Sequence, residues 1–193
     1  MKKKFLLIIF GPCGAGKTSI AKGIASNYTF PLISRDTIKE LLFDNIGWRD
    51  RDWCTKLGST SYQLLYFFTD KLLETGSSFI LESNQINFKI LAKKINDLKD
   101  RHTYIPIIIR CFADKQILFE RAIARDASGE RHPGHIYPTN YEEYKKMLLE
   151  YDGEFNNEFS IEGLDFEFID VDTTVFDNKV YELLYSKIDK III

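Results

Sequence analysis

The chain has 193 residues and a net charge of −2, with 45% hydrophobic and 28% charged residues. This length suits one domain over residues 1–193, and the composition excludes an intrinsically disordered protein. The slightly acidic balance lacks the basic surplus of proteins that bind nucleic acid along an extended surface, although it leaves room for a local basic channel.

In chain order, short apolar segments that predict strands alternate with segments of helical periodicity. The predicted strands are residues 4–10, 31–34, 78–82, 104–110 and 166–171. The predicted helices are residues 17–26, 36–44, 59–75, 88–98, 115–125, 141–151 and 177–190. Continuous apolar runs such as LLIIF and IPIII are typical of strands covered on both faces by helices. The alternation therefore predicts an α/β fold with a mostly parallel, doubly wound sheet of five strands that binds ligands at the carboxyl ends of its strands.

The first apolar segment follows three lysines, as the core of a secretory signal would. Its apolar run stops at Gly11, too early for a signal peptide, and no segment approaches the roughly 20 apolar residues of a membrane span. The cysteines Cys13, Cys54 and Cys111 are widely spaced and form no metal-binding pattern. We therefore expect a cytoplasmic protein with reduced thiols.

Residues 11–18 read GPCGAGKT and match the GxxxxGK[ST] pattern of a phosphate-binding loop at every position. A predicted strand precedes the loop and a predicted helix follows it, so backbone N–H groups and the helix N-terminus can face phosphates. Lys17 is expected to bridge the β- and γ-phosphates, and the Thr18 hydroxyl to ligate magnesium. We expect ATP and Mg²⁺ as cofactors, with the nucleotide held by Gly11, Pro12, Cys13, Gly14, Ala15, Gly16, Lys17, Thr18 and Ser19.

Ser34, Arg35 and Asp36 lie at the end of the second predicted strand, which places Asp36 at the carboxyl edge of the sheet, facing the γ-phosphate. A carboxylate there can accept the proton of an attacking hydroxyl, which phosphoryl transfer needs and a nucleotide-binding switch does not. Asp36 also precedes TIKELL and would cap a helix well. The two roles are compatible.

The segments MKKKFLLIIFGPCGAGKTSIA and ISRDTIKELL resemble the kinase domain of phage-type polynucleotide 5′-hydroxyl kinases and related small bacterial P-loop kinases. That group includes gluconate kinase, shikimate kinase, chloramphenicol phosphotransferase and zeta toxin. The resemblance implies the three-layer αβα sandwich of P-loop NTPases, with Asp36 as catalytic base and Arg35 beside it as a substrate contact. Lys39 stands where polynucleotide kinases usually carry an arginine that holds substrate phosphate, and the two residue types are not interchangeable.

The third predicted strand ends in FILESN, an apolar run followed by an acid, which is a loose Walker B pattern. Glu82 is expected to hold magnesium through water or to orient the substrate. The resemblance implies that Asn84 contacts the substrate as well. An acid at a strand end also occurs by chance, so the sequence leaves that alternative open.

The segment GWRDRDW lies where these kinases carry a substrate-recognition insertion, here about residues 45–58. Its rings and guanidinium groups could clamp an acceptor, which would make Arg49 and Trp53 substrate contacts. They could equally cap a helix hairpin. The sequence does not decide between these roles.

Arg121 and Arg125 lie one helical turn apart, and Arg131 follows at the start of a stretch rich in glycine and proline. The stretch resembles the mobile lid of these kinases, here about residues 121–140, whose arginines close over the phosphates and stabilise the charge of the transition state. The same arginines could instead form a solvated face paired with neighbouring acids. Near the carboxyl end of the chain, VDTT resembles the loop beside the adenine, so Thr173 and Thr174 are expected to contact the base.

Three functions fit these features. The leading prediction is an ATP-dependent phosphotransferase acting on a hydroxyl of a small molecule or nucleoside. One alternative is a 5′-hydroxyl polynucleotide kinase, favoured by Arg49, Arg51 and Lys39, and the other is a non-catalytic nucleotide-binding switch or toxin-like regulator. The expected partners are a nucleoside triphosphate and a small acceptor, with nucleic acid less favoured, no membrane, and a monomer or homodimer.

Overall fold

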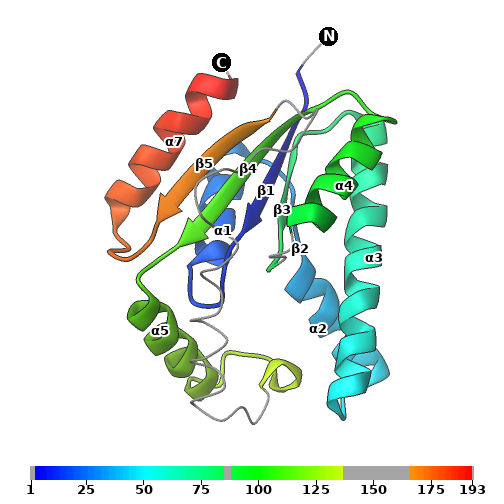
Figure 1. Cartoon of the computed structure of the whole chain (residues 1–193), viewed down its shortest axis with the longest axis vertical. Coiled ribbons are helices and arrows are strands. Elements are labelled where there is room, and N and C mark those ends of the chain that lie inside the picture. Colours follow the sequence, from blue (N-terminus) through cyan, green and yellow to red (C-terminus); the bar gives the residue numbers. More distant parts are fainter. Residues whose placement is uncertain (1–2, 85–87, 137–165, 193) are drawn as a thin grey trace.

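The computed structural model describes residues 3–84, 88–136 and 166–192. Within these ranges the strands form one sheet in the order β2-β3-β1-β4-β5, in which every neighbouring pair is parallel (Figure 1). The strands are β1 (Phe5–Phe10), β2 (Leu32–Ser34), β3 (Phe79–Glu82), β4 (Ile105–Phe112) and β5 (Glu167–Asp172). The predicted parallel sheet of five strands is therefore confirmed.

The helices occupy the predicted intervals and are generally longer than their sequence patterns. They are α1 (Lys17–Tyr28), α2 (Arg35–Ile46), α3 (Arg51–Thr75), α4 (Phe88–Lys99), α5 (Lys115–Ala127), the 3-10 turn η1 (Pro133–His135) and α7 (Asn178–Ile192). The predicted helix over residues 141–151 and the end of the predicted lid, residues 137–140, lie outside the described residues. No helix in the described ranges is long and apolar enough to cross a membrane.

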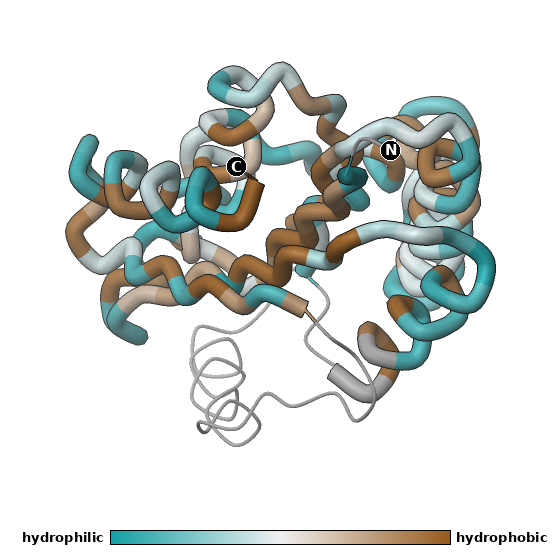
Figure 2. The backbone as a smooth tube through the Cα atoms, turned by 90° about the horizontal axis from the view of Figure 1, so that it is seen from above, coloured by the Kyte–Doolittle hydropathy of each residue, from teal (hydrophilic) through white to brown (hydrophobic). Residues whose placement is uncertain are grey.

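Helices cover both faces of the sheet, as the continuous apolar strands require. Alternate residues of β1 point to opposite sides, so Leu7 and Ile9 pack with α1 and α7, whereas Leu6 and Ile8 pack with α3 and α4. All four side chains are buried. Figure 2 shows the strands as a hydrophobic band through the middle of the molecule, with hydrophilic segments on the outer helices. The chain thus has the three-layer αβα sandwich that the sequence predicts.

The strand order directs the functional loops to one edge of the sheet. In parallel sheets with helices on both faces, ligands bind outside the carboxyl ends of the strands, near the point where the strand order reverses. Here β1 is central, and the loop after it leads into α1 between the ends of β3 and β4. The predicted phosphate loop, the start of α2, and residues 82–84 at the end of β3 therefore face a common region.

Helix α3 begins at Arg51, eight residues before the predicted start at residue 59. The Asp50 side chain accepts a hydrogen bond from the Trp53 backbone N–H at 2.8 Å, which satisfies a free donor of the first turn. The helix ends at Thr75, and the following C-cap residue Gly76 has a φ of 78°, a left-handed conformation that glycine adopts without strain. Residues 51–58 of the predicted insertion are consequently part of a regular helix.

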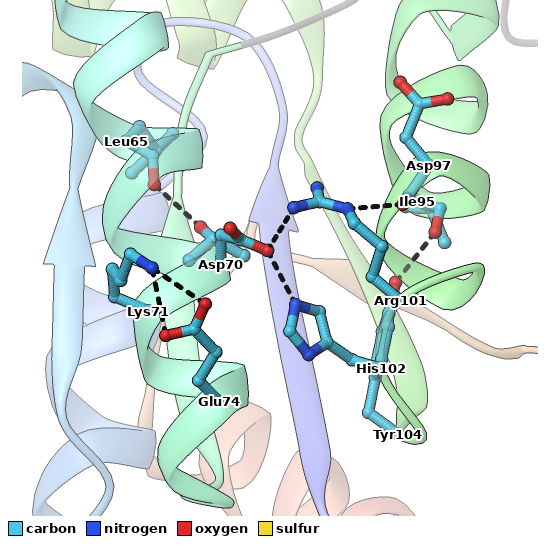
Figure 3. A network of polar contacts seen from close by, with 10 residues as sticks. Leu65, Asp70, Lys71, Glu74, Ile95, Asp97, Arg101, His102 and Tyr104 are labelled. Carbon is cyan, nitrogen blue, oxygen red and sulfur yellow. Dashed lines mark hydrogen bonds and ion pairs between the residues drawn. The ribbon is translucent and has the colours of Figure 1, made fainter.

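A separate polar network joins α3 to the connection between α4 and β4 at the amino end of the sheet (Figure 3). The Asp70 carboxylate accepts hydrogen bonds from Arg101 Nη1 at 2.5 Å and from His102 Nε2 at 2.6 Å. Nearby, the Tyr104 hydroxyl donates to the Ile95 carbonyl at 3.0 Å. These bonds connect elements that are distant in sequence and stabilise the sheet edge opposite the functional loops.

Candidate functional site

The predicted phosphate loop is tightly packed against its surroundings. A Cβ at Gly11 would lie 2.1 Å from the Cys111 carbonyl oxygen, and one at Gly14 would lie 2.4 Å from the Leu118 carbonyl oxygen. Both residues also have positive φ, so a larger residue would be strained as well as obstructed. The buried Lys17 ammonium donates to the Pro12 carbonyl at 2.8 Å, which holds it over its own loop. Glycines at these positions allow the tight backbone turn that a phosphate-binding loop requires.

Thr18 and Glu82 lie side by side at the ends of adjacent elements. Thr18 Oγ1 donates to Glu82 Oε1 at 3.3 Å, and Ser34 Oγ donates to Glu82 Oε2 at 2.5 Å. Glu82 is only 3% exposed, so these two hydroxyl groups, rather than bulk water, supply hydrogen bonds to its carboxylate. The contact of Ser34 with Glu82 carries no recognisable sequence signal, because a serine at the end of a short strand is compatible with many partners.

Hydroxyl and carboxylate oxygens are the hard ligands that Mg²⁺ prefers, and this ion usually takes only one or two protein groups, with the remaining ligands supplied by phosphates and water. Among the described residues no cluster of three or more His, Cys, Asp or Glu side chains could hold a metal. The pair Thr18 and Glu82 therefore fits a nucleotide-bound magnesium rather than a metal held by protein alone.

Asp36 lies in the first turn of α2, and Ser34, not Asp36, occupies the N-cap position of that helix. Arg35 Nη1 donates to Asp36 Oδ1 at 3.0 Å. Burial alone would raise the pKa of Asp36, but the Arg35 guanidinium, His135 and Lys17 together lower it below its usual value. Asp36 is therefore an ionised carboxylate at neutral pH, as a group that accepts a proton must be.

Two cations of α2 are buried beside Asp36. Arg35 is 8% exposed and Lys39 is 6% exposed. The Arg35 guanidinium lies over the Tyr62 ring, 4.8 Å from its centroid, and the Lys39 ammonium lies over the Phe43 ring at 5.0 Å. Both approach α3 closely at Gly58, where a Cβ would lie 2.9 Å from Arg35 Nη2 and 3.8 Å from Lys39 Nζ.

The positive charge of this pair is incompletely compensated. Burial, followed by the neighbouring Arg35, lowers the pKa of Lys39. Over the described part of the chain, no carboxylate lies within ion-pair distance of the Lys39 ammonium. Arg35 Nε is buried without a hydrogen-bond partner. Buried polar groups are normally paired, so this cluster has unused capacity to bind an anion.

Asn84 follows β3 and is hydrogen bonded to an aromatic residue of α3. The Tyr62 hydroxyl, from α3, donates to Asn84 Oδ1 at 2.9 Å. Tyr62 also contacts Arg35 through its ring. Nothing in the sequence distinguishes Tyr62 from the other aromatic residues of α3, since its role depends on the packing of α3 against α2 and β3.

The predicted lid arginines occupy different surroundings. Arg121 Nη2 donates to the Thr173 carbonyl at 2.9 Å and to the Thr174 carbonyl at 3.2 Å, while its Nη1 lies 3.5 Å from the Gly14 carbonyl. Arg121 thus joins the phosphate loop to the loop predicted beside the base. Arg125 is exposed. Arg131 forms an ion pair with Asp126.

The segment after α5 packs on α2. The His132 ring stacks on Phe43 with centroids 5.1 Å apart, and its Nε2 lies 3.1 Å from Asp44 Oδ1. The His135 ring meets Phe43 edge-on at 5.3 Å, and its Nε2 lies 3.3 Å from Glu40 Oε1. Burial, partly opposed by Asp36, lowers the pKa of His135 to about 4, so this imidazole is neutral near pH 7. The segment therefore brings the neutral His135 ring close to Asp36.

Arg49 and Trp53 lie at the turn between α2 and α3 and contact each other. The Arg49 guanidinium lies 4.5 Å from the centroid of the Trp53 ring, and Trp53 Nε1 donates to the Gly47 carbonyl at 2.9 Å. These contacts, with the Asp50 cap, favour the helix-hairpin cap over a substrate clamp. A substrate role for Arg49 and Trp53 stays a prediction.

The chain is similar to one protein family and to several solved structures. The profile of a family described as an AAA domain matches residues 6–136. A candidate kinase from Chloroflexus aurantiacus j-10-fl is 30% identical, with a TM-score of 0.79 over 96% of this chain and 98% of that one. No curated protein matches the chain.

Two more distant structures share the fold. A sugar kinase from Janibacter sp. HTCC2649 is 16% identical, with a TM-score of 0.58 over 96% of this chain and 95% of that one. A structure from the PezAT toxin–antitoxin system of Streptococcus pneumoniae is 15% identical, with a TM-score of 0.53 over 69% of this chain and 57% of that one. At these identities the similarity extends to the fold alone.

Proposed function

Since the chain belongs to the AAA domain family and shares the P-loop fold of the kinases above, we propose that it is a phosphotransferase that moves the γ-phosphoryl group of ATP to a hydroxyl group of a small molecule or nucleoside. The observation that carries this proposal is the set of Lys17, Thr18 with Glu82, and Asp36 around the carboxyl edge of the sheet. A nucleotide-binding switch has no use for an ionised carboxylate in the position of Asp36.

In the proposed reaction, the acceptor oxygen bonds to the γ-phosphorus while the bond from that phosphorus to the β–γ bridging oxygen breaks, and ADP leaves. The hydroxyl proton passes to Asp36. Lys17 exchanges its bond to the Pro12 carbonyl for the β- and γ-phosphate oxygens. Thr18 and Glu82 would hold Mg²⁺, which neutralises charge developing on the phosphates. Arg121, Arg125 and Arg131 remain candidates for cations that close over the nucleotide.

The acceptor that suits this site best carries an anionic group near its hydroxyl. Lys39 and Arg35 are buried, adjacent and under-compensated, and an anion between them would supply the missing partner. A carboxylated or phosphorylated small molecule meets this requirement. A 5′-hydroxyl oligonucleotide is the second candidate, because its phosphates are also anionic.

The test is a transfer assay with purified protein, Mg²⁺ and γ-labelled ATP against neutral, carboxylated and phosphorylated acceptors and 5′-hydroxyl oligonucleotides, at low and high salt. Label on an anionic small molecule supports the proposal. Transfer to an oligonucleotide that falls steeply with salt would favour the second candidate, because many phosphate contacts are then involved. Nucleotide binding without transfer to any acceptor would refute the phosphotransferase and favour a switch.

Lys39→Met tests the anionic subsite once an acceptor is known. We expect the KM for an anionic acceptor to rise at least tenfold, while the Kd for ATP stays the same. Lys56→Met is the matched control, because Lys56 lies on α3 with an exposed side chain. An equal effect of both substitutions, or no effect of either, would refute the subsite.

A further inference from the structure

Tyr62 is the link between two groups on the acceptor side of the proposed site. Its hydroxyl donates to Asn84 Oδ1 at 2.9 Å, just beyond β3. Its ring supports the Arg35 guanidinium at 4.8 Å, and Arg35 Nη1 in turn donates to Asp36 Oδ1 at 3.0 Å. A continuous series of contacts therefore connects the end of β3, through α3, to the carboxylate of α2.

The surroundings of Tyr62 restrict its movement. Its ring stacks on Tyr66, one turn further along α3, with centroids 6.4 Å apart and planes inclined by 21°. One turn earlier, Gly58 leaves room for Arg35 Nη2 against the helix backbone. The Arg35 side chain is 10% exposed, so a guanidinium fixed between a ring and a helix has few alternative positions. Tyr62 thus defines where Arg35 lies relative to Asp36.

We propose that Tyr62 is a positioning residue of the acceptor site, whose ring holds Arg35 against Asp36 and whose hydroxyl holds Asn84 at the end of β3. The role of Tyr62 in catalysis rests on the proposed phosphotransferase function. The effect of Tyr62 on the Asp36 carboxyl does not rest on that function, because it is a property of the protein without any substrate. The ring and the hydroxyl of Tyr62 therefore have effects that can be measured separately.

The ring acts on the proton affinity of Asp36. The ionisable groups that interact electrostatically with Asp36 lie on α1, α2, α3 and η1. They are Lys17, Arg35, Lys39, Glu40, Tyr62 and His135. Arg35 is the largest of the influences that favour the ionised carboxyl. Without the ring, the guanidinium is free to leave Asp36, and the proton affinity of the carboxyl should rise several-fold.

The first experiment follows the Asp36 carboxyl by carbon-13 NMR during a pH titration of the unliganded protein, with the signal assigned from Asp36→Asn. Tyr62→Met removes the aromatic face but keeps an apolar side chain of comparable length, and should increase the proton affinity of Asp36 several-fold. Tyr62→Phe keeps the face and should leave the titration unchanged. Phe67→Leu is the control, because Phe67 is an exposed aromatic residue of the same helix.

The second experiment measures acceptor kinetics. Tyr62→Phe releases Asn84 and should raise the KM for the acceptor about tenfold with little change in kcat, whereas Tyr62→Met should also move the acid limb of the kcat profile to higher pH. If Tyr62 is merely structural, both variants will lose thermal stability while the Asp36 titration and the KM stay at wild-type values. If Tyr62→Met does not fold, an unchanged KM in Tyr62→Phe is sufficient to overturn the hydroxyl role. Absence of transfer activity with a shifted Asp36 titration would refute the proposed function and leave the ring role intact.

Discussion

Asp36→Asn separates the structural and catalytic roles of one carboxylate, because the amide has the same shape but no charge. Breaking a fully buried ion pair costs about 3–5 kcal/mol, whereas an exposed pair contributes about 0.2–1 kcal/mol. The Arg35 side chain is 10% exposed and the Asp36 side chain is 34% exposed, so the pair is intermediate. Allowing for solvent screening of Asp36, we expect a loss of about 1–2 kcal/mol at pH 7.

The pH dependence of this loss has a definite sign. The folded-state pKa of Asp36 is lower than its unfolded value, so the carboxylate contributes stability above the unfolded pKa, and this contribution disappears as the pH falls through the folded pKa. The wild type and Asp36→Asn should therefore differ in urea unfolding at pH 7 and converge in acid. In the transfer assay, loss of a positioned base should reduce kcat by roughly 10²–10⁴-fold. The Kd for ATP should not change.

Two results would refute this reasoning. If Asp36→Asn retains full turnover, Asp36 is not the proton acceptor. If its free energy of unfolding equals that of the wild type at pH 7, the contact with Arg35 contributes nothing to stability. Asp44→Asn is a suitable control for turnover, because Asp44 lies on the same helix, contacts His132, and has a side chain that is 63% exposed.

Three further predictions concern the phosphate loop, the opposite sheet edge and the segment after α5. Lys17→Ala should abolish transfer while circular dichroism stays unchanged, and residual transfer near the wild-type rate would remove Lys17 from the mechanism. Asp70→Asn should cost about 1 kcal/mol at neutral pH, because the amide oxygen can still accept from His102 and from the more exposed Arg101 but no longer carries the negative charge that strengthens both bonds. Those bonds lower the pKa of Asp70, so the loss should vanish in acid; a difference in urea midpoint that persists below the folded pKa would contradict this cause. Gly134→Ala should disturb the packing of residues 132–135 on α2, since the new Cβ would lie 2.6 Å from the Phe43 ring. The fluorescence of Trp48 in a Trp53→Phe background would report the displacement of this segment, because the ring centroids of Trp48 and His132 are 6.3 Å apart. An unchanged emission spectrum would argue against the packing of the segment on α2.

The sequence predicted the fold well because local patterns determine it. The apolar runs and the glycine-lysine loop each depend on neighbouring residues, and each is present where expected. The start of α3 was misplaced because charged residues conceal the helical period, whereas the Asp50 cap determines the start. Tyr62 could not be predicted, since its contacts with Arg35 and Asn84 arise only when α3 packs against α2 and β3.

The charges around α2 suggest that binding of the phosphoryl acceptor would itself make Asp36 a stronger base. Arg35 and Lys17 hold Asp36 ionised, which makes it a weak base before the acceptor binds. An anionic group placed between Lys39 and Arg35 would compensate part of that positive charge and would stand close to the Asp36 carboxylate. Both effects raise the pKa of a carboxyl, and a higher pKa makes a stronger base near neutral pH. An anionic acceptor would thereby increase the basicity of Asp36 at the moment when its own hydroxyl must lose a proton, whereas a neutral analogue of the same shape would bind without this effect. The kcat for the two acceptors should then differ more than their differences in binding alone would require.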